Sequence, residues 1–182
     1  MVKTLTQWTV ADYHHMIASS LLAGRHVELI NGQIVDRAPE LPIHRATYRR
    51  GVKYLEALLG DQVIVFSAAM ITLPNDGEPE PNIAIVRPLE SRDDSQHPGP
   101  TDIYWLIEVS NSTLAYDSGE KANIYAQNNI QDYWVVDIAA KQIWVHRQSN
   151  EGTYTSIEKL TSGTLTPVTM PSIKVQIERL FI

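Results

Sequence analysis

The sequence contains no cysteine among its 182 residues. Disulfide bonds and zinc sites built from thiolates are therefore excluded. No run reaches the roughly 18 apolar residues that a membrane-spanning helix requires. Residues 1–8 have neither an apolar signal core nor an arginine-rich amphipathic pattern. We therefore expect a soluble cytoplasmic protein with no membrane association.

Positively charged residues are also fewer than negatively charged ones. The chain has 15 Lys and Arg against 21 Asp and Glu, so its formal net charge is −6. A general polyanion binder draws on lysine and arginine for phosphate contacts, so any nucleic-acid surface must be local. One candidate is a stripe of Arg45, Arg49 and Lys53, which recur every fourth residue and would share one helix face. The alternative is a solvated helix face without a partner.

The residues that are present indicate one globular domain over residues 1–182. A hydrophobic content of 43% and a charged content of 20% are ordinary for such a domain. A chain of this length buries roughly two thirds of the surface that its unfolded form would expose. A second domain is not expected.

The order of predicted elements indicates a mixed α/β (α+β) fold, with a mixed β-sheet flanked by helices and with additional β-hairpins. Thr9 resembles a helix cap, and Asn31-Gly32 joins two apolar runs in the pattern of a type I′ hairpin turn. We predict helices at about 10–21, at 43–59 and around Lys121. We predict strands at 27–30, 33–35, 63–73, 82–86, 102–110, 133–138, 142–146, near Tyr154 and near Ile173, with a proline-punctuated loop over 87–101.

Glu108 lies inside Asp102-Ile-Tyr-Trp-Leu-Ile-Glu-Val-Ser110, a run that is otherwise suited to a buried strand. Burying an unpaired carboxylate costs several kcal/mol, so a cation, a metal or a raised pKa is expected beside it. Lys121 follows thirteen residues later, in a predicted helix that can fold back onto the strand. A strand carboxylate with a positioned lysine suggests metal-assisted chemistry.

Glu28, Asn82 and Glu108 each place a polar side chain against apolar strand sequence, and together they could line one pocket. Mg²⁺ prefers oxygen ligands and takes one or two protein carboxylates, while it keeps several waters. Glu108 can supply a carboxylate, and the main-chain carbonyl of Val109 a second oxygen. Lys121 could orient or deprotonate a water and offset charge on a phosphate.

The ordered motifs Val-Glu-Leu-Ile-Asn-Gly, Pro-x-Ile-Ala-Ile-Val, Glu-Val-Ser, Tyr-Asp-x-Gly-Glu-Lys and Tyr-Trp-Val-Val-Asp, with a histidine-headed helix, run from about Glu28 to Val145. They resemble the family named putative restriction endonucleases, within the PD-(D/E)XK nuclease superfamily. The resemblance implies a restriction-endonuclease-like core and Mg²⁺-dependent hydrolysis of DNA phosphodiester bonds, with Mn²⁺ as a possible substitute. It implies catalytic roles for Glu28, Asn82, Glu108 and Lys121, with the lysine moved from the strand to the next helix.

One position departs from the family pattern, because Pro81 is followed by Asn82 where the family has aspartate. An amide oxygen can contact Mg²⁺ but adds no charge, so weaker metal binding or lost activity is expected. Glu80 could compensate, although Pro81 disfavours a regular strand there. A nuclease-fold protein without catalysis, which binds nucleic acid or a protein partner, is therefore the alternative. An active enzyme is expected to be a homodimer, since two symmetric sites can cut both strands.

Several of these residues also have ordinary structural explanations. Glu28 could pair with a surface cation, and Lys121 could be an exposed helix residue paired with Glu120 or Asp117. His44 heads the basic helix and could touch a phosphate, or it could be a local cap. The remaining histidines show no metal-ligand spacing, so we do not expect a zinc site.

Overall fold

The computed structural model describes residues 5–37, 39–88 and 95–181. Its largest element is a six-stranded sheet with the order β3-β4-β5-β6-β7-β8. β5 and β6 run parallel, whereas the other neighbouring pairs are antiparallel, so the sheet is mixed as predicted. The strands are β3 (Ile64–Ser67), β4 (Ile83–Val86), β5 (Ile103–Ser110), β6 (Asp132–Asp137), β7 (Gln142–Asn150) and β8 (Thr153–Leu160).

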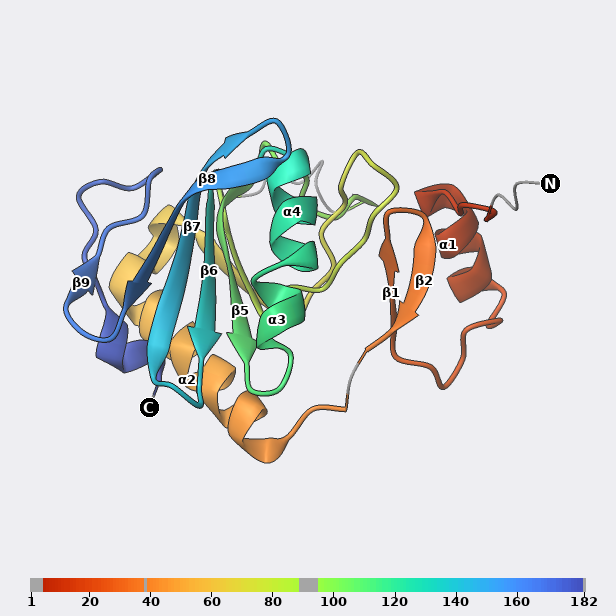
Figure 1. Cartoon of the computed structure of the whole chain (residues 1–182). Coiled ribbons are helices and arrows are strands. Elements are labelled where there is room, and N and C mark those ends of the chain that lie inside the picture. The colour runs from red at the N-terminus through yellow and green to blue at the C-terminus, as the bar shows by residue number, and fades with distance from the viewer. Residues whose placement is uncertain (1–4, 38, 89–94, 182) are drawn as a thin grey trace.

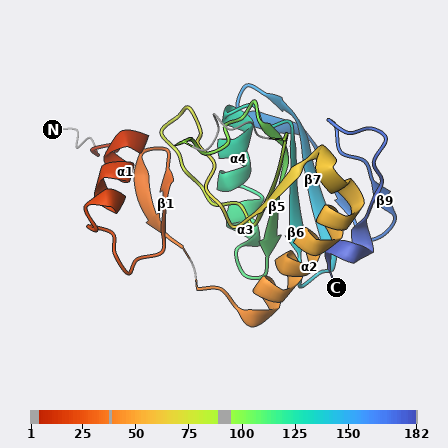
Figure 2. The same ribbon diagram turned by 180° about the vertical axis from the view of Figure 1, so that it is seen from behind.

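Helices cover both faces of this sheet (Figures 1 and 2). α2 (Pro42–Leu59) packs on one face, and α3 (Leu114–Asp117) and α4 (Glu120–Gln127) lie on the other. Successive strand side chains point to opposite faces, so Trp105 and Ile107 join the apolar cluster with α2, whereas Leu106 joins the cluster with α4. Glu108 therefore points to the α4 face.

The N-terminal part forms a unit beside the sheet, at the end away from the C-terminal strands (Figure 1). It holds α1 (Val10–Ala18) and the hairpin of β1 (Val27–Ile30) with β2 (Gln33–Asp36). Thr9 and Asp12 form a capping box that starts α1. Asn31 and Gly32 have φ values of 45° and 73°, which confirms the predicted hairpin turn.

The segment from Ser67 to Asn82 connects this unit to the sheet. The backbone N–H of Glu78 donates to the carbonyl of Leu29 at 2.7 Å, and that of Gly32 donates to the carbonyl of Asp76 at 2.8 Å. These bonds place the hairpin next to the start of β4. Glu28 on β1 is thereby brought toward the sheet.

Several predicted boundaries were wrong. The strand predicted over 63–73 ends at Ser67, because Ala68 has a φ of 45°, outside the extended region. α1 ends at Ala18 and excludes Leu21, since Ser20 has a φ of 60°. Within the predicted loop over 87–101, residues 89–94 lie outside the described part of the chain.

Near the C-terminus, the strand predicted around Tyr154 is the eight-residue β8, and the strand predicted near Ile173 begins two residues after it. The chain there forms the small pair β9 (Thr164–Leu165) and β10 (Val175–Gln176), and the 3-10 helix η3 (Ile177–Leu180) packs on α2. Another 3-10 helix, η1 (Gly60–Gln62), follows α2. No helix in the described part of the chain combines the length and hydrophobicity that a membrane span needs.

Candidate active site

Glu108 lies near the end of β5, where it is only 4% exposed. Both faces of β5 are covered by other elements. A strand in this position is built from a nearly continuous run of apolar residues, as the sequence around Glu108 is. Within that run, Glu108 has three donors. Its Oε1 atom accepts from Tyr125 Oη at 3.2 Å and lies 2.7 Å from Lys121 Nζ, while Oε2 accepts from the Asn82 N–H at 3.2 Å. The expected partner cation is therefore Lys121.

Lys121 lies in the first turn of α4 and is 5% exposed, so it is not the solvated helix residue of the alternative explanation. Its Nζ atom lies 2.7 Å from Glu108 and 3.7 Å from Glu28 Oε2. Burial alone would lower the pKa of Lys121, but the carboxylates of Glu108 and Glu28 outweigh burial and raise this pKa. Lys121 therefore carries a positive charge at neutral pH.

Glu28 comes to the site from β1, far from β5 in sequence. Its Oε1 atom lies 3.1 Å from Arg37 Nε and accepts from the Glu80 N–H at 3.3 Å. Burial raises the pKa of Glu28, while Lys121 and Arg37 oppose that rise. Glu28 thus lies between two cations, one of which is Lys121 of the site.

Asn82 bridges β4 and β5 just before β4 begins. The last register pair joins Ile83 to Ile107, and beyond it the Oδ1 atom of Asn82 accepts from the Val109 N–H at 2.8 Å. The N–H and C=O of a strand residue point to the same side of the strand. The Val109 carbonyl therefore faces the space beside β5 that lies beyond the start of β4. Asn82 therefore fixes the mouth of the site through its amide oxygen.

A cavity of about 310 Å³ opens over these residues. Asp117 and Tyr116 form part of its wall, with Thr113 beside them. Asp117 is 6% exposed and accepts from Thr113 Oγ1 at 2.6 Å. Burial, followed by the nearby charge of Glu108, raises the pKa of Asp117 to about 6. Its proton would bind or leave within the physiological range.

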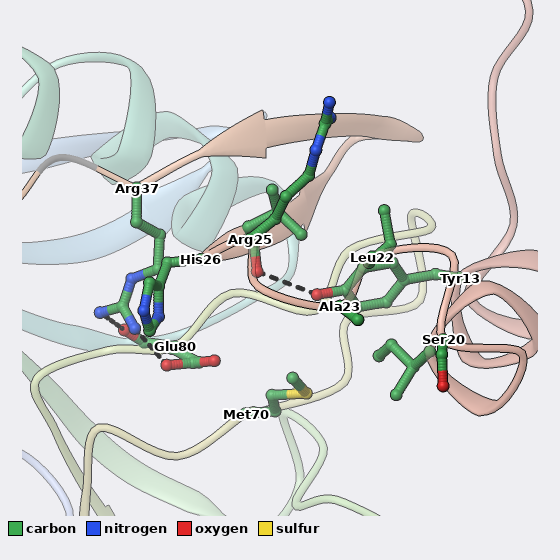
Figure 3. Close-up of a pocket in the computed structure, with 11 residues that line it drawn as sticks. Tyr13, Ser20, Leu22, Ala23, Arg25, His26, Arg37, Met70 and Glu80 are labelled. Atoms are coloured by element: carbon green, nitrogen blue, oxygen red, sulfur yellow. Dashed lines mark hydrogen bonds and ion pairs between the residues drawn. The ribbon is translucent and has the colours of Figure 1, made fainter.

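Arg37 lines both this cavity and a second one, of about 260 Å³, between α1 and β1 (Figure 3). Figure 3 shows its guanidinium turned toward Glu80, and Arg37 Nη1 bonds the Glu80 carboxylate. Glu80 lies before β4 and lines the second cavity, where Tyr13 donates to the Val27 carbonyl at 2.9 Å. Glu80 therefore does not supply a carboxylate beside Asn82, because its charge is paired with Arg37 and it is not among the residues that line the cavity over Glu108.

The structure brings together Glu28, Asn82, Glu108, Val109, Lys121 and His44, all of which line the same cavity. His44 lies in the first turn of α2, with its Nδ1 atom 3.0 Å from Glu40 Oε1. Arg45, Arg49 and Lys53 are exposed on α2 and do not line the cavity. Arg45 lies 3.6 Å from Glu40, so its charge is partly paired.

No functional role was predicted from the sequence for three residues that contact the site, namely Arg37, Asp117 and Tyr125. Arg37 follows β2 and reaches Glu28 only through the hairpin, so local spacing does not reveal it. Tyr125 fits a helix core position and is indeed fully buried. Asp117 belongs to the Tyr-Asp-x-Gly-Glu-Lys motif, so its position four residues before Lys121 in that motif was the signal available in the sequence.

The oxygen donors at the mouth of the cavity fit a hard divalent cation. Glu108 offers one carboxylate, Asn82 one amide oxygen and Val109 one carbonyl. Mg²⁺ binds with one or two protein carboxylates and fills its other positions with water and substrate oxygens. The amide of Asn82 is neutral, so Glu108 is the one negatively charged member of this set.

A six-stranded mixed sheet with helices on both faces is the arrangement of a nuclease-like fold. The chain is similar to a solved structure from Anabaena variabilis ATCC 29413, which is described as a putative nuclease belonging to DUF820. The TM-score is 0.64 at 16% identity, and the match covers 85% of this chain and 89% of that one. At this identity the likeness establishes the fold.

Residues 10–178 match the model of the Uma2 family, described as putative restriction endonuclease. The match spans nearly the whole sequence, and the chain belongs to this family. Comparison with curated proteins gave no match. The resemblance drawn from the motifs is confirmed.

Proposed function

We propose that the chain is a Mg²⁺-dependent endonuclease that hydrolyses phosphodiester bonds in DNA. One observation carries the proposal: the Nζ atom of Lys121 lies 2.7 Å from Glu108 Oε1 at a cavity whose mouth presents three oxygen donors. A buried lysine and carboxylate on adjacent elements could instead be structural. Their opening to a cavity of about 310 Å³ favours a role in chemistry.

The oxygen donors of Glu108, Asn82 and Val109 would hold the metal ion. When bound, Mg²⁺ polarises a phosphate oxygen and lowers the pKa of a bound water. Lys121 would act as a fixed positive charge that orients the attacking water and offsets charge developing on the phosphate. Its raised pKa disfavours a role as general base while Glu108 remains paired with it.

Glu28 and Tyr125 act in this proposal through other residues. Glu28 holds the Lys121 ammonium as a second carboxylate beside Glu108, and Arg37 holds Glu28 in turn. Tyr125 donates to the same Glu108 oxygen that Lys121 contacts, which limits rotation of the carboxylate. These are positioning residues, and they keep the reacting groups in one geometry.

DNA would approach over the open side of the cavity, where His44 can reach a phosphate. The exposed Arg45, Arg49 and Lys53 of α2 would add backbone contacts, which position a duplex without reading its sequence. The net charge of −6 confines attraction for DNA to such local groups. A homodimer would place two active sites on opposite strands.

Asn82 favours a second candidate function, that of a nuclease-fold protein which binds nucleic acid or a protein partner without cleaving. The amide removes one negative charge where the family has aspartate, and Glu80 does not restore it because Arg37 pairs with it. Affinity for a hard cation depends strongly on the charge of its ligands. Activity at millimolar Mg²⁺ therefore separates the two candidates.

The test is nicking of supercoiled plasmid in Mg²⁺ by the native protein, Lys121→Met, Glu108→Gln and the control Lys174→Met. Lys174 is exposed and remote in sequence from the site. We expect native activity to fall about 100-fold or more in the two site variants, the scale for losing one preorganised charged or polar group. Lys174→Met should match the native rate.

Loss of activity through unfolding must be distinguished from loss of chemistry. Removing one partner of a buried ion pair costs about 3–5 kcal/mol, so Lys121→Met can be destabilised. The double variant Lys121→Met with Glu108→Gln removes both charges and provides a second inactive protein, whose fold is checked by circular dichroism. Equal nicking by native protein and folded Lys121→Met would contradict the proposal, and a native protein silent in both Mg²⁺ and Mn²⁺ would favour the binding function.

A further inference from the structure

A second group of metal-binding side chains lies outside the candidate active site. His14 on α1, Glu78 in the segment before β4 and His97 in the segment before β5 each offer one ligand atom. These atoms all lie within 4.8 Å of one another. The three residues are far apart in sequence, which is why histidine spacing does not predict the cluster.

The backbone around the cluster positions its members. The N–H of Thr72 donates to the carbonyl of Pro98 at 3.0 Å, which holds His97 beside the Thr72 to Glu78 segment. The Glu78 N–H is fixed on Leu29 of β1 at 2.7 Å. The imidazoles of His14 and His97 meet edge to face, with centroids 6.1 Å apart. Three separate segments therefore converge on one point.

Glu78 is the residue that most strongly indicates a ligand. Its side chain is 0% exposed. Its Oε1 atom accepts from Thr72 Oγ1 at 2.7 Å, and Oε2 lies 2.7 Å from His14 Nε2. Among the residues that the structure describes, no lysine or arginine forms an ion pair with it. A buried carboxylate without a permanent cation is costly, and a metal ion would remove that cost.

We propose that His14, Glu78 and His97 bind a first-row transition-metal ion, with Zn²⁺ as the reference ion. Two imidazole nitrogens and one carboxylate oxygen suit Zn²⁺, whereas Mg²⁺ prefers oxygen ligands alone. Thr72 donates a hydrogen bond to the Glu78 carboxylate and would orient it toward the metal ion. A cavity of about 470 Å³ borders the three residues, so the fourth position is open to water.

Such an ion would clamp the N-terminal unit to the two segments that precede β4 and β5. α1 would be tied to Glu78, whose backbone already holds β1 one residue from Glu28. The metal site is distinct from the candidate active site, because it shares no residue with the cavity over Glu108. Its loss in a His14 or His97 variant can therefore be distinguished from a defect at Glu108 or Lys121.

The experiment is titration of tag-free native protein with Co²⁺, followed by visible absorption, and then displacement by Zn²⁺ in calorimetry. We expect one equivalent of Co²⁺ to give d–d bands that Zn²⁺ abolishes. His14→Ala and His97→Ala should each weaken Zn²⁺ binding by more than about 10-fold. Thr72→Val should weaken it by about 10- to 100-fold, the range for loss of an outer hydrogen-bond partner.

His15→Ala is the matched control, because His15 is the exposed neighbour of His14 on the same helix. It should bind Zn²⁺ as the native protein does. Zn²⁺ should also raise the melting temperature of the native protein and His15→Ala, but not that of His14→Ala. Absent d–d bands, or binding that survives in both His14→Ala and His97→Ala, would overturn the proposal.

Discussion

The carboxylates at the cavity have different electrostatic settings. Glu108 contacts the ammonium of Lys121 directly, whereas Asp117 relies on Thr113 Oγ1 and on burial that raises its pKa to about 6. The pairing of Glu108 with Lys121 was predictable from sequence, because an acid in an apolar strand needs a cation and the family motif supplies one nearby. Arg37 was not predictable, since its contact with Glu28 depends on how the hairpin closes.

Asp117→Asn should stabilise the protein in a pH-dependent way. The folded-state pKa of about 6 exceeds the usual 3.8, so the native carboxyl costs nothing below about pH 4. Its cost grows as the pH rises from about 4 to 6, because the unfolded chain releases the proton first. At pH 7 the variant should gain about 1–3 kcal/mol in free energy of unfolding, from 1.36 kcal/mol per pKa unit.

Urea unfolding at pH 4 and pH 7 measures this effect. Asparagine can still accept from Thr113, so the hydrogen bond is kept and only the charge is removed. Glu28 also has a raised pKa, but it titrates in both proteins and cancels in the difference. A gain of equal size at both pH values, or a loss at pH 7, would contradict the assignment.

At the level of elements, the β1–β2 hairpin carries Glu28 and depends on one glycine. Gly32 has a φ of 73°, and a Cβ atom there would lie 2.8 Å from the Cβ of Gln7. Its carbonyl accepts from the Trp8 N–H at 2.8 Å, so the chain before α1 packs directly on the turn. The turn type was predictable from Asn31-Gly32, but the close approach of Gln7 was not, because it is a tertiary contact.

Gly32→Ala should cost more stability than Gly24→Ala, which is its matched control. Gly24 also has a positive φ, of 77°, but nothing lies within 4 Å of its Cβ position. We expect about 1 kcal/mol for Gly24→Ala from backbone strain alone and about 2 kcal/mol or more for Gly32→Ala. Chemical denaturation of both variants measures the difference, and equal losses would show that Gln7 does not constrain the turn.

Errors at this level have a common physical cause. The strand predicted over 63–73 has suitable apolar residues, yet it ends where Ala68 takes a left-handed conformation. The chain beyond Ser67 turns to meet the hairpin, and its apolar Ile71 and Leu73 are buried there without a regular strand. Hydrophobic periodicity predicts burial in such segments, while long-range contacts determine the backbone path.

At the level of the whole molecule, the candidate site is assembled from four parts of the chain. Glu28 comes from the N-terminal hairpin, Asn82 from the start of β4, Glu108 from β5 and Lys121 from α4. The sequence predicted all four and the sheet that carries them, because each lies in a motif with its own local pattern. The cluster of His14, Glu78 and His97 has no such pattern and emerges only from the folded chain.

In the proposed function, this assembly is a nuclease centre in which the neutral Asn82 stands beside Glu108. Asn82→Asp adds a negative charge there, and it can keep the hydrogen bond from the Val109 N–H. The measurement is the rate of plasmid nicking as a function of Mg²⁺ concentration for the native protein and Asn82→Asp. The half-saturating Mg²⁺ concentration should be about 10-fold lower for Asn82→Asp than for the native protein, equivalent to about 1.4 kcal/mol of metal binding.

Lys121→Met should abolish the activity in both backgrounds. Coincident Mg²⁺ curves for native protein and Asn82→Asp, or activity in Asn82→Asp that survives Lys121→Met, would contradict the account.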